Sequence, residues 1–129
     1  MRIPAMSHAC ISEALQALLF EPDLELHQVL DQYYAPDYTH RSDGKTLNRD
    51  EFAKVIRRVR SEVTGGAVTV LDELCDGVTY AERHTICLSL ADGSLHHREI
   101  AVFGTFAEDG RFRRLSESGF DIDRPDQAP

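Results

Sequence analysis

Two residues of this chain, Glu117 and His40, have side chains that could exchange protons with a bound molecule. Glu117 follows Leu115 at strand spacing, so the two side chains share a face, and Leu115 suits an apolar interior. Desolvation in such an interior raises the pKa of an unpaired carboxyl group toward neutrality. Histidine, with an ordinary pKa of about 6.5, suits proton transfer near neutral pH. The two residues therefore predict cofactor-independent acid–base chemistry.

Both residues also have structural interpretations. Glu117 could be a solvated strand residue, and His40 could be a pocket-wall residue hydrogen-bonded to Tyr34 or Asp43. If Arg83 points inward, it could pair with Glu117, lower the pKa of that carboxyl group and make it structural. An inward arginine could equally bind an anionic ligand.

The strand that carries Arg83 has two faces, and only one of them can line an interior. Arg83 shares one face with Ala81 and Thr85, whereas His84 shares the other with Tyr80 and Ile86. The alternation alone leaves open which face points inward.

A metal site is not expected, although His96, His97 and Glu99 stand close together in the sequence. Adjacent histidines on a strand point to opposite faces, so only His97 and Glu99 could share one ion, without a third fixed ligand. No glycine-rich phosphate or dinucleotide motif occurs. We therefore expect no metal and no cofactor.

Composition narrows the class of protein. The chain has 129 residues, 42% of them hydrophobic, which suits one globular domain. Its net charge of −8 excludes nucleic-acid binding and an anionic membrane surface as the main role. Three cysteines without metal-site spacing suggest free thiols in a reducing compartment. With no signal-peptide or membrane-spanning run, a soluble cytoplasmic protein is expected.

The first half of the chain shows apolar residues at helical spacing in three places. These runs are Ile11–Leu19, Leu26–Tyr33 and Phe52–Val59. Asp23 is the expected N-cap of the second helix, which should stop near Ala35-Pro36.

The third helix has the clearest boundaries. Asn48 and Glu51 form a capping-box-like pair at its start. Gly65-Gly66 is expected to terminate it.

The second half predicts four strands separated by Asp-Gly turns, a pattern typical of antiparallel hairpins. A short extended piece at Tyr38–Arg41 could add an edge strand. Helices followed by strands indicate an α+β fold. The four predicted strands are Ala67–Leu74, Val78–Leu90, Ser94–Ala107 and Arg111–Ile122.

The third of these strands carries apolar residues on both faces. Ile100, Val102 and Phe106 lie on one face, and Ala101 and Phe103 on the other. A sheet covered by helices on one side should be polar on the other. The second apolar face therefore predicts a homodimer through the sheet, with scattered surface hydrophobes as the alternative.

Two segments resemble the nuclear-transport-factor-2-like superfamily, in its SnoaL-like branch. YYAPDYTHRSDGKTLNRDEF (Tyr33–Phe52) is similar to that branch's passage from the second helix, through a short strand, into the third. EIAVFGTFAEDGRFRRLSE (Glu99–Glu117) is similar to its last two strands and their turn. The resemblance spans about residues 10–122 and implies a single domain over 1–122, with a flexible tail at 123–129.

The resemblance implies a cone-shaped curved antiparallel sheet packed with three N-terminal helices, a cystatin-like α+β barrel. The cone should open between helices and sheet. Glu117 stands seven residues after Gly110, where several SnoaL-like enzymes carry an inward acid, and His40 stands where the branch often has an inward polar residue. The other residues expected to line the cone and bind ligand are Tyr34, Tyr38, Asp43, Arg83, Val102 and Leu115.

The classical steroid-isomerase pairing of that superfamily is not reproduced. Asp43 is the only possible equivalent of its first aspartate, and the second would fall near Val102. An isomerase of that mechanism is therefore not expected.

Three functions follow, in order of preference. The first is a small-molecule-binding protein of unassigned role that holds an apolar or aromatic ligand. The second is a cofactor-free acid–base enzyme of polyketide cyclase, isomerase, dehydratase or hydrolase type, using Glu117 with His40 or Arg83. The third is a dimeric protein-interaction module. Fold alone does not choose among them.

Overall fold

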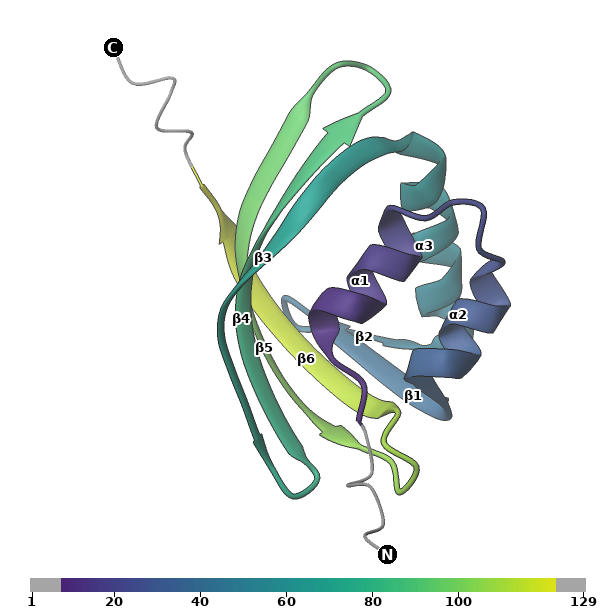
Figure 1. Ribbon diagram of the computed structural model, residues 1–129, viewed down its shortest axis with the longest axis vertical. Helices are drawn as coiled ribbons and strands as arrows, with labels where there is room; N and C mark the ends of the chain where they lie inside the picture. The colour runs from purple at the N-terminus through teal and green to yellow at the C-terminus, as the bar shows by residue number, and fades with distance from the viewer. Residues whose placement is uncertain (1–7, 123–129) are drawn as a thin grey trace, which may run out of the picture.

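Three helices pack on the concave side of one curved sheet in the computed structural model, which describes residues 8–122 (Figure 1). The tail expected at 123–129 lies outside the described residues. The arrangement is the α+β class expected from the order of helices and strands. None of the helices in the described range is long and apolar enough to cross a membrane.

The first two helices, α1 (Ile11–Leu19) and α2 (Leu26–Tyr33), follow the predicted apolar runs. The cap of α2 was wrongly predicted. Its N-cap is Glu25 rather than Asp23, and the Glu25 carboxylate accepts a hydrogen bond of 2.8 Å from the backbone N–H of Gln28. The helix also ends at Tyr33, before Ala35-Pro36, because the backbone turns extended at Tyr34 and enters the sheet.

The third helix, α3 (Arg49–Glu62), begins with the predicted capping box. The Asn48 side chain accepts from the Glu51 N–H at 2.8 Å, and the Glu51 carboxylate accepts from the Asn48 N–H at 2.9 Å. Its predicted end was wrong. Gly65-Gly66 lies inside the next strand, because pairing of Val63 with Leu90 starts sheet hydrogen bonding earlier.

Six strands form the sheet within the described range: β1 (Tyr34–Ser42), β2 (Lys45–Asn48), β3 (Val63–Asp76), β4 (Thr79–Leu90), β5 (Leu95–Phe106) and β6 (Phe112–Asp121). Their order is β2-β1-β6-β5-β4-β3, and the sheet is not closed. The long hairpins of β3 to β6 match the predicted strands and turns.

The first strand differs from expectation in two ways. It lies inside the sheet, between β2 and β6, and is not an edge strand. It also runs parallel to β6, with His40 opposite Leu115, so the sheet is mixed rather than fully antiparallel. Parallel neighbours need a long connection, which here is all of the chain from β2 to β5.

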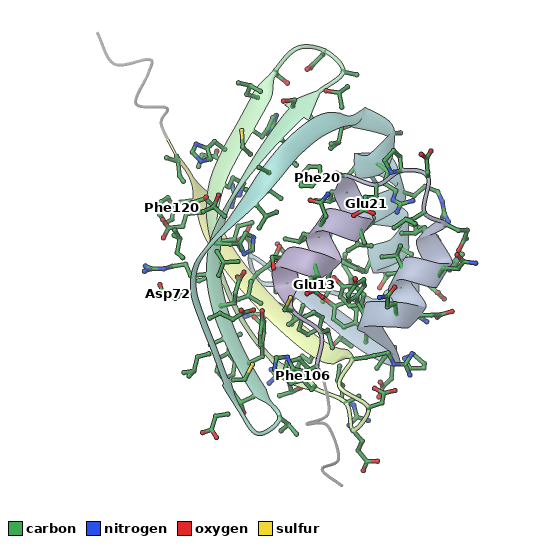
Figure 2. The ribbon with its side chains drawn as sticks, viewed as in Figure 1. Glu13, Phe20, Glu21, Asp72, Phe106 and Phe120 are labelled. Atoms are coloured by element: carbon green, nitrogen blue, oxygen red, sulfur yellow. The ribbon has the colours of Figure 1, made fainter. Side chains whose placement is uncertain are left out.

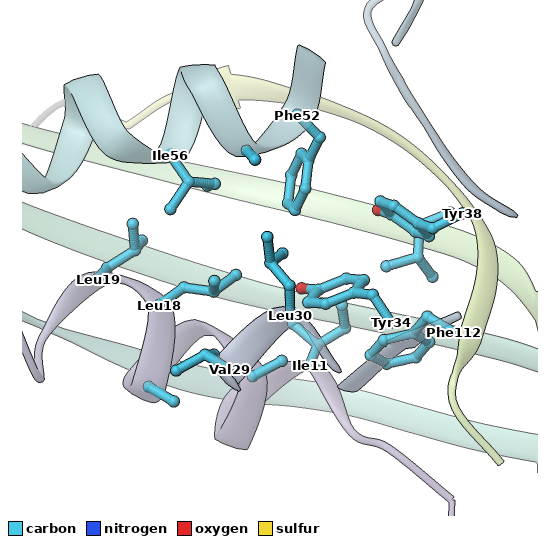
Figure 3. Close-up of a cluster of buried hydrophobic side chains, with 14 of the residues drawn as sticks. Ile11, Leu18, Leu19, Val29, Leu30, Tyr34, Tyr38, Phe52, Ile56 and Phe112 are labelled. Carbon is cyan, nitrogen blue, oxygen red and sulfur yellow. The ribbon is translucent and has the colours of Figure 1, made fainter. Parts of the chain in front are cut away.

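The core fills the space between the helices and the concave face of the sheet. Aromatic rings close one end, where Tyr34, Tyr80 and Phe106 surround Phe112 with ring centroids 5.4–5.6 Å apart. Figure 3 shows Tyr34 and Phe112 beside the aliphatic side chains of α1 and α2. Packing of these aromatic rings holds the ends of the adjacent strands in fixed positions, and these strands carry the candidate site.

Candidate functional site

A pocket of about 320 Å³ lies between the helices and the concave face of the sheet. Most of its wall is aliphatic and comes from α1, α3, β4 and β5, with Leu15, Val59 and Leu88 as examples. Val55, predicted to lie in the buried stripe of α3, is exposed and lines this pocket. Polar side chains also reach the wall: Tyr34, Tyr38, His40, Ser42, His84, Arg98 and Glu117.

Five of the residues singled out in the sequence meet in this pocket. They come from two strands that are far apart in the chain but paired in parallel: Tyr34, Tyr38 and His40 from β1, and Leu115 and Glu117 from β6. The register of β1 on β6 puts Ser42 opposite Glu117, so the carboxylate lies beside the strand that carries His40.

Arg83, expected to line the cone and bind ligand, does not belong to this group, and the pairing with Glu117 that an inward Arg83 would allow is not formed. Arg83 lies on the outer face of β4, where its Nη2 is 2.6 Å from Asp72 Oδ2 and its Nη1 is 3.7 Å from Glu99 Oε2. Figure 2 shows Asp72 projecting on the side of the sheet away from the helices. The opposite face of β4 carries the larger side chains Tyr80 and Ile86, which are buried in the core. Their packing turns that face inward and leaves Arg83 on the outer face.

Two further predicted ligand-binding residues lie near the pocket without lining it. Val102 is on the inner face but is buried in the core at 4% exposure. Asp43 occupies the turn after β1 with a φ of 49°, and its carboxylate lies 4.0 Å from Arg98. Arg98, which the sequence reasoning missed, lines the pocket and also contacts Asp121 at 2.8 Å.

A polar relay runs from Tyr38 through His40 to Glu117. The Tyr38 hydroxyl lies 2.6 Å from His40 Nδ1, and His40 Nε2 lies 3.5 Å from Glu117 Oε1. Burial keeps the pKa of Tyr38 well above its usual value, so the phenol stays protonated and can donate to Nδ1 of a neutral His40. The N–H of a neutral His40 is then at Nε2, facing the carboxylate.

The pKa of Glu117 is lowered, whereas the sequence predicted a raised value. Burial raises this pKa. The hydrogen bond and charge of His40, the Ser42 hydroxyl at 3.3 Å and the charge of His84 act in the opposite direction, and together they outweigh burial and lower the pKa. Glu117 also keeps 26% of its side chain exposed. The group is therefore a carboxylate at neutral pH, able to accept a proton.

Because the pKa of Glu117 is lowered in the folded state, Glu117→Gln should destabilise the protein by about 1 kcal/mol at neutral pH. A lowered pKa contributes stability above the unfolded value of about 4.3, and this stability is lost as pH falls through the folded value. The difference between wild type and variant should therefore close below about pH 4. Urea unfolding from acidic to neutral pH measures it.

The matched control for that series is Glu108→Gln, because Glu108 is an exposed turn residue. It should change stability little at any pH. A Glu117→Gln protein as stable as wild type at neutral pH would contradict the ionised, hydrogen-bonded carboxylate.

A buried ion pair on β4 is the main feature that the sequence left undecided. His84 and Glu82 are 1% and 4% exposed, and His84 Nδ1 lies 2.6 Å from Glu82 Oε1. Burial raises the pKa of Glu82, and the negative charges of Glu73 and Glu117 act in the same direction, against the hydrogen bond from His84. Side-chain size was the sequence signal for which face of β4 points inward. The face of His84 carries the large residues Tyr80 and Ile86, whereas the opposite face carries the smaller Ala81 and Thr85.

A second, larger depression of about 450 Å³ lies over α1 and α2. Its lining includes Glu13 and Glu21, two exposed carboxylates of the same charge. The described part of the chain brings no acid–base pair together there. The pocket beside Glu117 is therefore the better candidate site.

Comparison with known proteins finds no matching family model and no matching curated protein. Solved structures do match. An NTF2-like protein of unknown function from Exiguobacterium sp. 255-15 has a TM-score of 0.65 at 16% identity, over 87% of this chain and 98% of that one.

Two other solved structures match over most of both chains. A protein with a ketosteroid isomerase-like fold from Catenulispora acidiphila, solved with trimethylamine, has a TM-score of 0.61 at 12% identity, over 86% of each chain. TsrD from Streptomyces laurentii has a TM-score of 0.59 at 20% identity, over 86% of this chain and 91% of that one. The chain therefore has the nuclear-transport-factor-2-like fold. Sequence identities this low establish a shared fold but not a shared function.

Proposed function

We propose that this chain uses its nuclear-transport-factor-2-like fold to hold a small, largely apolar molecule in the pocket beside Glu117. The observation that carries the proposal is an aliphatic pocket of about 320 Å³ with a few polar groups gathered on its sheet wall. Pockets of this size and composition are typical of small-molecule sites, in which apolar walls supply affinity and polar groups fix orientation. The neighbour solved with trimethylamine supports the same kind of role.

A neutral fluorescent probe, N-phenyl-1-naphthylamine, tests this proposal. Wild-type protein should bind it with enhanced fluorescence, and Val59→Trp, which fills the pocket from α3, should weaken binding about tenfold or more. The matched control is Phe103→Ser on the outer face, which should leave binding unchanged. Circular dichroism of each variant checks the fold.

The control separates the pocket from the exposed apolar face. Phe103 is 52% exposed and could itself attract an apolar probe. Binding that survives Val59→Trp and is lost in Phe103→Ser would contradict ligand binding in the pocket.

A cofactor-free acid–base enzyme is the second candidate, favoured by the relay of Tyr38, His40 and Glu117. Glu117 would take a proton from a bound substrate, and His40, held by Tyr38 at 2.6 Å, would orient the carboxylate or return the proton. Isomerisation and dehydration are the reaction classes that such a pair serves. Turnover of this kind would be lost in Glu117→Gln while ligand binding is retained.

We also propose that the protein forms a homodimer through the outer face of the sheet. Leu74, Phe103 and Phe120 are 67%, 52% and 58% exposed on three of its strands. Figure 2 shows Phe120 on the side away from the helices. Cross-strand pairing puts Leu74, Ala81 and Phe103 in one row, which makes a continuous apolar strip.

A cytoplasmic location is part of the same proposal. Cys10, Cys75 and Cys87 are all free thiols. Free thiols are typical of a reducing compartment.

A further inference from the structure

We propose that the buried Glu82–His84 pair is a second ligand contact in the pocket, which offers an N–H group at His84 Nε2 and selects ligands with an uncharged acceptor oxygen, such as a ketone. This inference rests on the proposed ligand-binding function and names the chemical class of the ligand. It concerns β4, which lies on the same sheet wall of the pocket as Glu117 of β6, with β5 between them.

A buried polar atom of the pocket wall has no hydrogen-bond partner in the described part of the chain. His84 lines the pocket, and its Nε2 is buried without a hydrogen-bond partner among residues 8–122. Its other ring nitrogen is committed to Glu82 at 2.6 Å. A buried polar group without a partner is costly, so native proteins keep one only where something else satisfies it. A ligand in the pocket that His84 lines can supply that partner.

The protons held by Glu82 and His84 determine which kind of atom Nε2 can bind. An ionised Glu82 beside a neutral His84 would bury a net negative charge, which the low dielectric of the interior opposes. The nearby carboxylates of Glu73 and Glu117 oppose it too. The pair is therefore best described as net neutral, with one proton in the bond between Glu82 Oε1 and His84 Nδ1.

The place of the second proton follows from the same geometry. Neither Glu82 Oε2 nor His84 Nε2 has a partner in the described residues, but only His84 lines the pocket. A proton on Oε2 would be a buried donor that no ligand in the pocket could satisfy, whereas a proton on Nε2 can be given to a ligand. Nε2 is then an N–H donor whichever residue formally holds the shared proton, and its complement is an acceptor oxygen.

The charge of Glu117 favours a neutral acceptor over an anion as the ligand group. Cross-strand register places Glu82, Val102 and Glu117 in one row on the inner face, two strand spacings or about 10 Å from end to end. Glu117 is ionised, so a carboxylate ligand near His84 would meet a like charge across the same wall. A ketone offers the acceptor without the charge.

Nitrogen-15 NMR of the histidine rings tests the proton assignment without any ligand. At neutral pH, Nε2 of His84 should show the chemical shift of a protonated ring nitrogen, with the signal assigned by its absence in His84→Phe. A shift typical of a bare, accepting Nε2 would overturn the proposal.

Matched naphthalene compounds test the ligand class. Wild type should bind 2-acetylnaphthalene about tenfold tighter than 2-ethylnaphthalene, which has the same carbon skeleton but no acceptor oxygen. This preference should vanish in the double variant Glu82→Leu/His84→Phe, which removes the pair together. It should persist in Arg83→Gln, the control on the outer face of the same strand.

The possible outcomes distinguish a failure of the proposed ligand class from a failure of the proposed ligand-binding function. Equal binding of the ethyl and acetyl compounds, or tighter binding of the anion 2-naphthoate, would overturn the selection of a neutral acceptor while leaving a ligand-binding pocket. Failure of every naphthalene to bind, together with failure of N-phenyl-1-naphthylamine, would overturn the proposed function as well. Because the wild-type comparison needs no variant, poor folding of the double variant would not hide the result.

Discussion

Replacing His84 alone with phenylalanine should lower the free energy of unfolding by about 3 kcal/mol or more. Glu82 is 4% exposed, and His84 is its hydrogen-bond partner at 2.6 Å. Its other oxygen, Oε2, has no partner among the described residues. The variant would therefore leave a buried carboxyl group with neither a hydrogen bond nor solvent. Urea unfolding at neutral pH, followed by circular dichroism, measures the loss.

The double variant Glu82→Leu/His84→Phe should recover most of that stability. Apolar residues of similar size often replace a buried ion pair at little cost, because the desolvation penalty of both groups disappears. The two single variants and the double variant form a double-mutant cycle, which should give a coupling of about 2 kcal/mol. If the two single losses simply add in the double variant, Glu82 and His84 do not act as a pair.

Replacing Phe103 with aspartate should convert the proposed dimer into a monomer, with dimer affinity reduced about thirtyfold or more. Phe103 is the largest side chain of the apolar strip on the outer face and stands at its end, between Ala81 and Ser116 on the neighbouring strands. Docking of a second copy would take the new carboxylate out of water, which is costly. Because Phe103 is 52% exposed in the protomer, the fold itself should tolerate the change.

Light scattering coupled to size-exclusion chromatography at tens of micromolar measures this effect. Leu24→Asp is the matched control, since Leu24 is also exposed but lies between α1 and α2. It adds the same charge and should leave the dimer intact. A wild-type protein that is monomeric at this concentration would contradict the dimer directly.

Local sequence signals determined the elements of this protein. Helical spacing of apolar residues located α1 and α2, and Asn48 with Glu51 located the start of α3, because caps and amphipathic faces depend on residues within a few positions of one another. The Asp-Gly turns located the hairpins of β3 to β6 for the same reason. The resemblance of two segments to a known superfamily then indicated how these elements assemble, and the fold agrees.

Tertiary structure alone decided which chemistry the pocket can carry. Strand alternation shows that Arg83 and His84 point to opposite sides, but only packing of the helices against one side makes the face of His84 the inner one. Likewise, nothing local to Glu117 indicates its partner. Parallel pairing of β1 with β6 brings His40 and Ser42 to the carboxylate, and these long-range contacts turn an expected rise in its pKa into a decrease.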